Sequence, residues 1–416
     1  MKEDYSFESA PPAGEAKLSV FQLFLIFLRL GLTSFGGPVA HLGYFREEFV
    51  TRRKCLGEHD YADLVALCQF LPGPASSQVG MGIGISQGGV RGALAAWLGF
   101  TLPSVVVLVL FAYGIALMPT DFAGSGWMHG LKVVAVAVVA QAIWGMARTL
   151  CSGRLRATVA ILAASLMLAL PNAMTQIVVI FSGGLFGLLF LGSDDEVEQT
   201  TLQIPIDRRT GFLNLALFGL LLCGLPIFSY IYPNHTIDLI DHFYRAGALV
   251  FGGGHVVLPL LREATVSQGW ISKGLFLAGY GAAQTVPGPL FTFAAYLGAV
   301  MSLEPHGWVG AIICLVSIFL PSLFLLLGIL PFWDQIRRIM EVRCVMSGVN
   351  AAVVGLLLAV FYDTVWSGGI LSANDFILAL IAFALLTFWK MPSWVVVLLT
   401  AVSSAALSAV QLYPGL

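Results

Sequence analysis

Long apolar stretches dominate this chain, and they constrain its fold more than any other feature. Thirteen runs approach the roughly 20 residues that an α-helix needs to cross a bilayer. They are 18–37, 61–85, 92–118, 130–150, 158–170, 174–192, 212–232, 239–257, 275–303, 308–332, 345–366, 376–389 and 394–412. The runs are continuous and do not alternate every second residue, so they predict helices rather than barrel strands. We therefore expect an all-α integral membrane protein of about 13 transmembrane or re-entrant helices.

The charge content supports this expectation and excludes other classes of protein. Charged residues make up 11% of the chain, against roughly 25% in soluble domains, which excludes a soluble enzyme or a disordered chain. With 21 Lys and Arg against 23 Asp and Glu, there is no basic excess to bind nucleic acid. The lipid bilayer is the partner that this composition predicts.

Metal and nucleotide motifs are missing from the sequence. The six cysteines are scattered without a CxxC pair, and the seven histidines form neither HxxxH nor HExxH, so we expect no metal site. No Walker A motif points to an ATP-driven pump. We expect a membrane transporter without a cofactor, and no enzyme.

The two halves of the chain repeat each other at a nearly constant offset of 215–218 residues. Arg29–Gly37 aligns with Arg245–Gly253, because both segments share an arginine followed six residues later by Phe-Gly-Gly. Further matches in the same order are Arg46-Glu47 with Arg262-Glu263, Gln69 to Pro74 with Gln284 to Pro289, and Pro103-Ser104 with Pro321-Ser322. An internal duplication explains this order of matches.

The duplication predicts the domain organisation. Residues 1–17 form a cytoplasmic tail, 18–192 the first repeat, 193–238 a polar linker with a connecting transmembrane helix, and 239–416 the second repeat. Each repeat holds six apolar segments, and the connecting helix adds one crossing. The second repeat is therefore expected to have inverted topology, as in many secondary transporters.

Positive charges predict the orientation. If every segment crosses, the side of the N-terminus carries fourteen lysines and arginines, and the other side carries only Arg46, Arg52, Arg53 and Lys54. This bias places the N-terminus in the cytoplasm. The four exceptions lie in one loop, which leaves an alternative: 18–37 and 61–85 are re-entrant hairpins that return the loop to the inside.

Arg29 and Arg245 are candidate substrate residues, because each lies inside an apolar segment. A cation at that depth costs at least about 2.5–3.5 kcal/mol and usually faces a cavity or a partner. The arginine fork suits an oxyanion, since it can donate two parallel hydrogen bonds. The alternative is structural: each arginine caps a broken helix or pairs with a carboxylate.

Two kinds of helix break follow these arginines. Neither Phe35 to Pro38 nor Phe251 to Gly254 can continue a regular helix, because glycine admits positive φ and proline lacks an N–H. Freed amides at the start of the next helical piece can bind an anion; the alternative is close packing through small residues. The second break is Pro72-Gly73-Pro74, which is repeated as Pro287-Gly288-Pro289.

Polar residues flank these second breaks. Ser76 and Ser77 are predicted in the first turn of the helix that follows Pro72-Gly73-Pro74, where they could donate to an oxyanion. The second repeat has Leu290, Phe291 and Thr292 there, so the two sites are not equivalent. Gln69 and Gln284 precede the breaks at equal spacing and either satisfy freed carbonyls or touch substrate.

Gating or coupling residues are predicted after the glycine breaks. Arg46-Glu47 and Arg262-Glu263 are either solvated helix ends or a gate that carries a proton. His255 follows Gly254 and could titrate near neutral pH, although a structural role is the alternative.

With its paired Phe-Gly-Gly and Pro-Gly-Pro motifs after intramembrane arginines, the chain resembles the chromate ion transporter family, in its long-chain, two-domain form. The resemblance implies a multi-pass protein of the cell inner membrane that exports chromate, confers chromate resistance and is driven by membrane potential or a proton gradient. It also implies that the motif residues act on substrate. In the first repeat these are Arg29, Phe35, Gly36, Gly37, Pro38, Gln69, Pro72, Gly73 and Pro74. In the second they are Arg245, Phe251, Gly252, Gly253, Gln284, Pro287, Gly288 and Pro289. Beyond the motifs, we also predict substrate contacts at Ser34, Ser76, Ser77, Gly254 and His255, although Gly254 stands where the first repeat has Pro38.

The residues themselves leave alternatives open. They indicate a transporter for a tetrahedral oxyanion but do not separate chromate from sulfate. A membrane enzyme acting on a lipid phosphate is a weaker alternative, and a homodimer is one open choice for the assembly.

Overall fold

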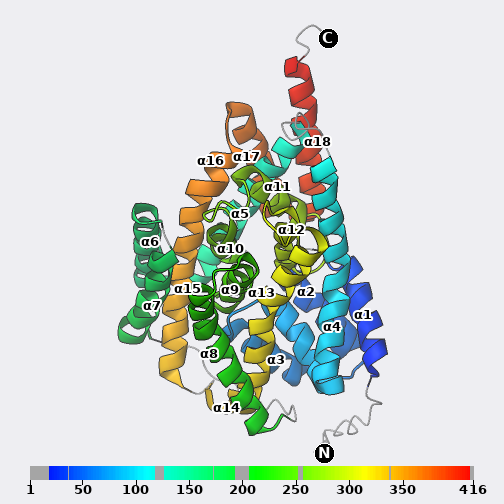
Figure 1. The fold of residues 1–416 in the computed structure, drawn as a ribbon, viewed down its shortest axis with the longest axis vertical. Coiled ribbons are helices and arrows are strands. Elements are labelled where there is room, and N and C mark those ends of the chain that lie inside the picture. The colour runs from blue at the N-terminus through cyan, green and yellow to red at the C-terminus, as the bar shows by residue number, and fades with distance from the viewer. Residues whose placement is uncertain are drawn as a thin grey trace, which may run out of the picture.

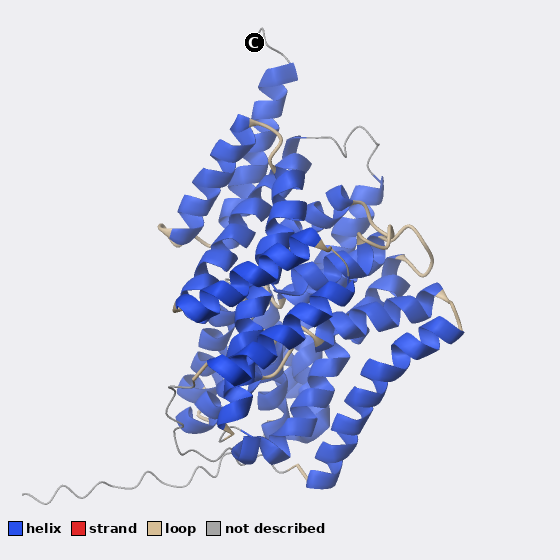
Figure 2. Ribbon diagram, turned by 90° about the vertical axis from the view of Figure 1, so that its left-hand side faces the viewer, coloured by secondary structure: helices blue, strands red, loops and turns tan. Residues whose placement is uncertain are grey.

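The computed structural model describes residues 18–35, 37–117, 126–171, 173–192, 206–251, 256–336 and 339–412. Across these ranges the chain is helical and forms no strand (Figure 2). The described part contains five helices that are long and apolar enough to cross a membrane: 75–117, 126–150, 208–231, 307–332 and 340–369. The all-α membrane class is therefore confirmed, whereas a count of thirteen separate helices is not.

The first repeat forms eight elements, and one further helix follows it. They are α1 (Val20–Thr33), α2 (Gly37–Arg46), the π-helical η1 (Glu47–Arg52), α3 (Glu58–Phe70), α4 (Ala75–Leu117), α5 (Gly126–Leu150), α6 (Arg154–Ala169), α7 (Ala173–Phe190) and the connecting α8 (Arg208–Ile231). The predicted run 61–85 is divided differently, because Pro-Gly-Pro ends α3 and the rest of the run opens α4. Helix α4 then bends at Gly88 and Gly89, whose backbones are not helical.

The second repeat has elements in the same order. They are α9 (His235–Ala248), α10 (Val257–Thr265), α11 (Lys273–Ala283), the 3-10 turn η4 (Leu290–Thr292), α12 (Phe293–Val300), α13 (Gly307–Ile329), η5 (Leu330–Phe332), α14 (Trp333–Ile336), α15 (Met340–Val360), η6 (Phe361–Trp366), α16 (Ser367–Gly369), α17 (Ala373–Thr387) and α18 (Ser393–Leu412). Each Pro-Gly-Pro break thus falls between two helices, and the described Phe35 and Phe251 follow the ends of α1 and α9. Gly37 and Pro38, which were predicted to belong to the first break, instead open α2.

Short helices around the first-repeat breaks fold back as two hairpins. The Phe27 ring in α1 contacts the rings of Phe45 and Phe49, which follow the break, at 5.5 and 5.2 Å, so α2 and η1 return along α1. In the second hairpin, the side chain of Gln87 in α4 donates to the carbonyl of Cys55 before α3 at 3.1 Å. Gln87 also accepts from the amide of Leu18 at 3.4 Å. These bonds place the bases of both hairpins at one end of the repeat.

The second repeat builds the same pair of hairpins. At its base, the His235 ring at the start of α9 contacts Trp270 at 4.6 Å between ring centroids. The amide of Ser302, after α12, donates to the carbonyl of Trp270 at 3.2 Å. These three residues match Leu18, Cys55 and Gln87 at shifts of 217, 215 and 215. Equivalent positions therefore close the hairpin bases in both repeats.

The long helices interlock the two repeats. Helix α5 of the first repeat packs on α17 and α18 of the second, while α15 of the second packs on α6 and α7 of the first. Figure 1 shows α6 and α7 against α15 on one side, and α17 and α18 at the end that the C-terminus approaches. Glycines allow the close approach, because an added Cβ at Gly348 would lie 2.0 Å from the Gly183 carbonyl oxygen. Neither repeat completes its packing alone.

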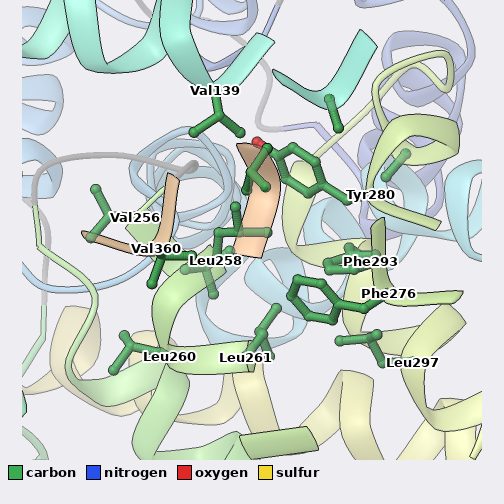
Figure 3. Close-up of a cluster of buried hydrophobic side chains, with 14 of the residues drawn as sticks. Val139, Val256, Leu258, Leu260, Leu261, Phe276, Tyr280, Phe293, Leu297 and Val360 are labelled. Atoms are coloured by element: carbon green, nitrogen blue, oxygen red, sulfur yellow. The ribbon is translucent and has the colours of Figure 1, made fainter. Parts of the chain in front are cut away.

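The largest apolar core lies where α5, α15 and the second-repeat hairpins meet (Figure 3). It includes aromatic residues of α11 and α12, such as the stacked rings of Phe293 and Tyr296, whose centroids lie 5.9 Å apart. A separate cluster surrounds Phe27 and Phe45 in the first-repeat hairpins and includes Leu325 and Leu326 of α13.

Candidate functional site

Two backbone hydrogen bonds join the hairpin tips of one repeat to those of the other. The amide of Gly73 donates to the Val250 carbonyl at 2.7 Å, and the amide of Gly288 donates to the Ser34 carbonyl at 3.1 Å. The two bonds are equivalent, since Ser34 matches Val250 and Gly73 matches Gly288 in the repeat. We call this region, formed by Ser34, Val250 and the two Pro-Gly-Pro breaks, the crossing. It places four sequence-predicted motifs together.

Glycine is required at both Pro-Gly-Pro breaks. Gly73 and Gly288 have φ of +123° and +98°, where side chains are rarely tolerated. An added Cβ would lie 2.3 Å from Ser322 Oγ at Gly73 and 2.4 Å from Ser104 Oγ at Gly288. Ser104 also donates a hydrogen bond to the Pro287 carbonyl. The serines that cover each break come from the opposite repeat.

The Gly73 and Gly288 amides are not available to an anion, because both donate to carbonyl oxygens of the other repeat. A helix nevertheless starts where predicted, with Ser76 and Ser77 buried in the first turn of α4. The amides of that turn precede the first intrahelical hydrogen bond, which Gln78 donates to Pro74 at 2.9 Å. They, rather than the glycine amides, carry the positive end of a helix.

Several buried polar atoms near the crossing have no hydrogen-bond partner within the described part of the chain. They include Ser34 Oγ, Ser77 Oγ, Ser322 Oγ and Gln284 Nε2. An unsatisfied buried polar group costs about 1–3 kcal/mol, so a cluster of them calls for an explanation. Ser34, Ser77 and Ser322 are each at most 2% exposed. These hydroxyl and amide groups are uncharged hydrogen-bond donors, and an oxyanion can accept hydrogen bonds from them.

A large cavity lies beside Gln284, just before the Pro287-Gly288-Pro289 break. It has a volume of about 530 Å³ and is lined by Phe35, Gly37, Tyr44, Val138, Gln141, Gln284, Leu386, Lys390, Met391, Pro392, Ser393 and Trp394. Four of these residues, Phe35, Gly37, Gln284 and Ser393, also line an adjacent pocket of about 30 Å³, which has room for a water molecule or two. That pocket is lined by Ser34, Phe35, Gly37, Pro38, His41, Ala283, Gln284, Val286, Gly288, Leu290 and Ser393. Ser34 of the first repeat and Gln284 of the second therefore face one space.

A second cavity lies beside the end of α3, just before the Pro72-Gly73-Pro74 break. It has a volume of about 500 Å³ and is lined by Ala66, Gln69, Phe70, Thr149, Leu150, Arg156, Gly192, Trp333, Arg343, Met346, Ser347 and Asn350. The matched glutamines Gln69 and Gln284 thus line separate cavities. Both glutamines lie just before their breaks, as the sequence spacing predicts.

The two intramembrane arginines have different surroundings. Arg245 donates through Nε to Asp241 at 2.9 Å and through Nη2 to the other carboxylate oxygen, and Asp241 is 2% exposed. This pair favours the structural alternative for Arg245. Arg29 is exposed on α1, on the same face as Phe21 and Leu25. The first repeat has Leu25 where the second has Asp241, and neither arginine lines a cavity described above.

Of the expected gating residues, the two arginines form ion pairs near the hairpin bases. Arg46 makes a two-pronged pair with Glu58 at 2.6 and 2.9 Å, and this partner raises the pKa of Arg46. Arg262 pairs with Asp363 in η6, while Glu263 accepts from the Ser267 hydroxyl at 2.8 Å. Glu47 is exposed. The arginines therefore pair with distant carboxylates rather than with the glutamates beside them.

Five predicted residues, Gly36, Gly252, Gly253, Gly254 and His255, lie outside the described residues. Phe251 is described and partly buried before that gap. Sequence reasoning also missed His41, which is 1% exposed and lies 3.3 Å from Ser76 Oγ. It missed Lys390 as well, although a cation between two apolar runs was a visible signal.

Comparison with known proteins decides the family. The family model described as "Chromate transporter" matches residues 21–188 and 237–405. The chain belongs to the chromate transporter family. The two matched stretches correspond to the two halves that share the Phe-Gly-Gly and Pro-Gly-Pro motifs.

Curated relatives in this family match over most of their length. A chromate transport protein of Pseudomonas aeruginosa is 29% identical, over 86% of this chain and 83% of the relative. A chromate transport protein of Cupriavidus metallidurans is 24% identical, over 94% and 93%. An uncharacterised transporter of Methanocaldococcus jannaschii is 26% identical, over 82% and 83%. No solved structure matches the chain.

Proposed function

We propose that this chain exports chromate across the cytoplasmic membrane by alternating access and thereby confers chromate resistance. Its family and its relatives named as chromate transport proteins support chromate as the substrate. The crossing supports a binding site between the repeats, because it gathers neutral donors from both. The single observation that carries the site is the pocket that Ser34 and Gln284 share.

In this proposal the dianion enters the large cavity and inserts oxygens into the small pocket at the crossing. Lys390 at the cavity wall attracts the charge. The Ser34 hydroxyl and the Gln284 amide then donate to oxygens that have lost water. Since these donors belong to different repeats, a bound oxyanion would tie the two together. A rocking of the repeats about the crossing would expose the site to the other side.

The hairpins fit an inverted topology with an even number of membrane-spanning helices in each repeat. If both hairpins return to their own side, four helices of each repeat cross, and α8 adds one more. The loop with Arg46, Arg52, Arg53 and Lys54 then joins the N-terminal side. Of the fourteen lysines and arginines counted on the N-terminal side, only Arg262 and Lys273 move to the opposite side. There Arg262 pairs with the Asp363 carboxylate and Lys273 donates to the Asp363 carbonyl. The re-entrant alternative therefore improves the positive-inside bias.

The membrane potential is the proposed driving force. Export of a dianion from a cell that is negative inside gains about 2.3 kcal/mol per charge per 100 mV. Proton coupling through Glu47, Glu263 or His255 is the alternative. A transport current in proteoliposomes supports the potential-driven form, whereas electroneutral transport excludes it.

Radiolabelled chromate uptake into everted membrane vesicles tests the function. Energised uptake that survives excess sulfate is the expected result. Uptake abolished by sulfate would instead indicate a general oxyanion transporter. Absence of uptake, with the folded protein shown in the membrane, would refute the proposal.

A further inference from the structure

We propose that the cavity beside the end of α3 is an anion-capture site, in which Arg156 and Arg343 bind the oxyanion before it reaches the crossing. This inference rests on the proposed transport function. Neither arginine was among the motif residues, and both belong to the polar lining of a cavity of about 500 Å³.

The lining of this cavity has the chemistry of a site for a tetrahedral dianion. Two arginines supply permanent positive charge and forked donors. Thr149, Ser347 and Asn350 add neutral polar groups. No aspartate or glutamate belongs to the part of the lining that the structure describes. Arginines in a cavity with low-dielectric walls attract anions from solution.

The cavity is assembled from both repeats. Arg156 comes from α6 of the first repeat, and Arg343 from α15 of the second. These helices pack together along the interface between the repeats. A dianion that contacts both arginines would therefore bridge elements that must move relative to one another in alternating access.

The cavity borders the end of α3, the helix that runs up to Pro72-Gly73-Pro74 in the crossing. Gln69 in its wall lies three residues before Pro72, whose carbonyl accepts a hydrogen bond from Gln78 Nε2 at 2.8 Å. The positive-inside bias assigns Arg156 and Arg343 to the cytoplasmic side. An exporter must collect its substrate from the cytoplasm, and this cavity is assigned to that side.

The test compares chromate uptake by everted vesicles containing Arg156→Gln, Arg343→Gln or the control Arg154→Gln. Arg154 opens α6, is exposed and does not line the cavity. Loss of a charged hydrogen bond predicts a KM raised about tenfold to a hundredfold in the first two variants. It also predicts a weaker dependence of their KM on ionic strength. An unchanged KM in correctly folded variants would overturn the inference.

A second variant and a binding measurement keep the inference separate from the transport proposal. Asn350→Asp places a negative charge in the cavity with little change of shape, and we expect a raised KM; an unchanged KM counts against the site. In purified protein, sulfate should raise the apparent Tm of wild type and Arg154→Gln more than that of Arg156→Gln or Arg343→Gln. If wild type fails to carry chromate, a larger Tm rise with sulfate in wild type than in the two arginine variants still supports an anion site. Equal Tm rises in all four proteins would overturn the inference.

Discussion

Replacing Gly73 with alanine tests the crossing, because the glycine meets three separate constraints. Its φ of +123° is strained for alanine, at a cost of about 1–3 kcal/mol. The new Cβ would lie 2.3 Å from Ser322 Oγ and 2.7 Å from Gln78 Nε2. Relief of that clash would weaken the 2.7 Å bond from Gly73 to Val250, worth about 0.5–1.5 kcal/mol. We expect a loss of roughly 2–4 kcal/mol in stability.

The assay is thermal unfolding of purified protein at one fixed scan rate, because membrane proteins of this size often unfold irreversibly. Gly219→Ala is the matched control, since Gly219 lies in α8 with open space around its Cβ position. In a helix that change gains up to about 1 kcal/mol. Gly73→Ala should lower the apparent Tm and chromate uptake, and Gly73→Ala/Ser322→Ala should recover part of the Tm. Equal Tm values for Gly73→Ala and Gly219→Ala would refute the reasoning.

Three further outcomes follow from the ion pairs and from Arg29. Asp241→Asn should destabilise the protein by about 3–5 kcal/mol, because it leaves Arg245 without its buried partner; Asp241→Leu/Arg245→Leu should recover the Tm, and failure to do so would show that the charges have another role. Arg29→Gln should leave the chromate KM unchanged in vesicle uptake, since Arg29 is exposed on α1 and lines neither large cavity; a large KM change would return it to the substrate path. Asp363→Asn should lower stability by about 1 kcal/mol or less, since Asp363 is 47% exposed where Arg262 meets it, and a larger drop in denaturant unfolding would contradict this.

The sequence predicts the helix breaks because their causes are local. Glycine and proline patterns end helices wherever they occur, and the structure places both kinds of break as expected. The repeat was also readable, since duplicated motifs keep their spacing. Even the structural alternative for Arg245 had a local signal, because Asp241 lies four residues before it on the same helical face.

Long-range geometry was beyond the sequence pattern. A 14-residue helix such as α1 can be part of a segment that spans the membrane or of a hairpin that folds back. Only long-range contacts, such as that of Phe27 with Phe45, decide between these two arrangements. The contact of Ser104 with Pro287 joins residues 183 positions apart. No periodicity predicts that the breaks of one repeat bond to those of the other.

Chromate uptake by vesicles that carry Ser34→Ala or Gln284→Ala tests the central claim most directly, with Gly219→Ala as the control. The claim is that donors from both repeats hold the oxyanion at the crossing. It predicts a chromate KM raised about tenfold or more in each variant, with folding intact. An unchanged KM and maximal rate in both variants would contradict it.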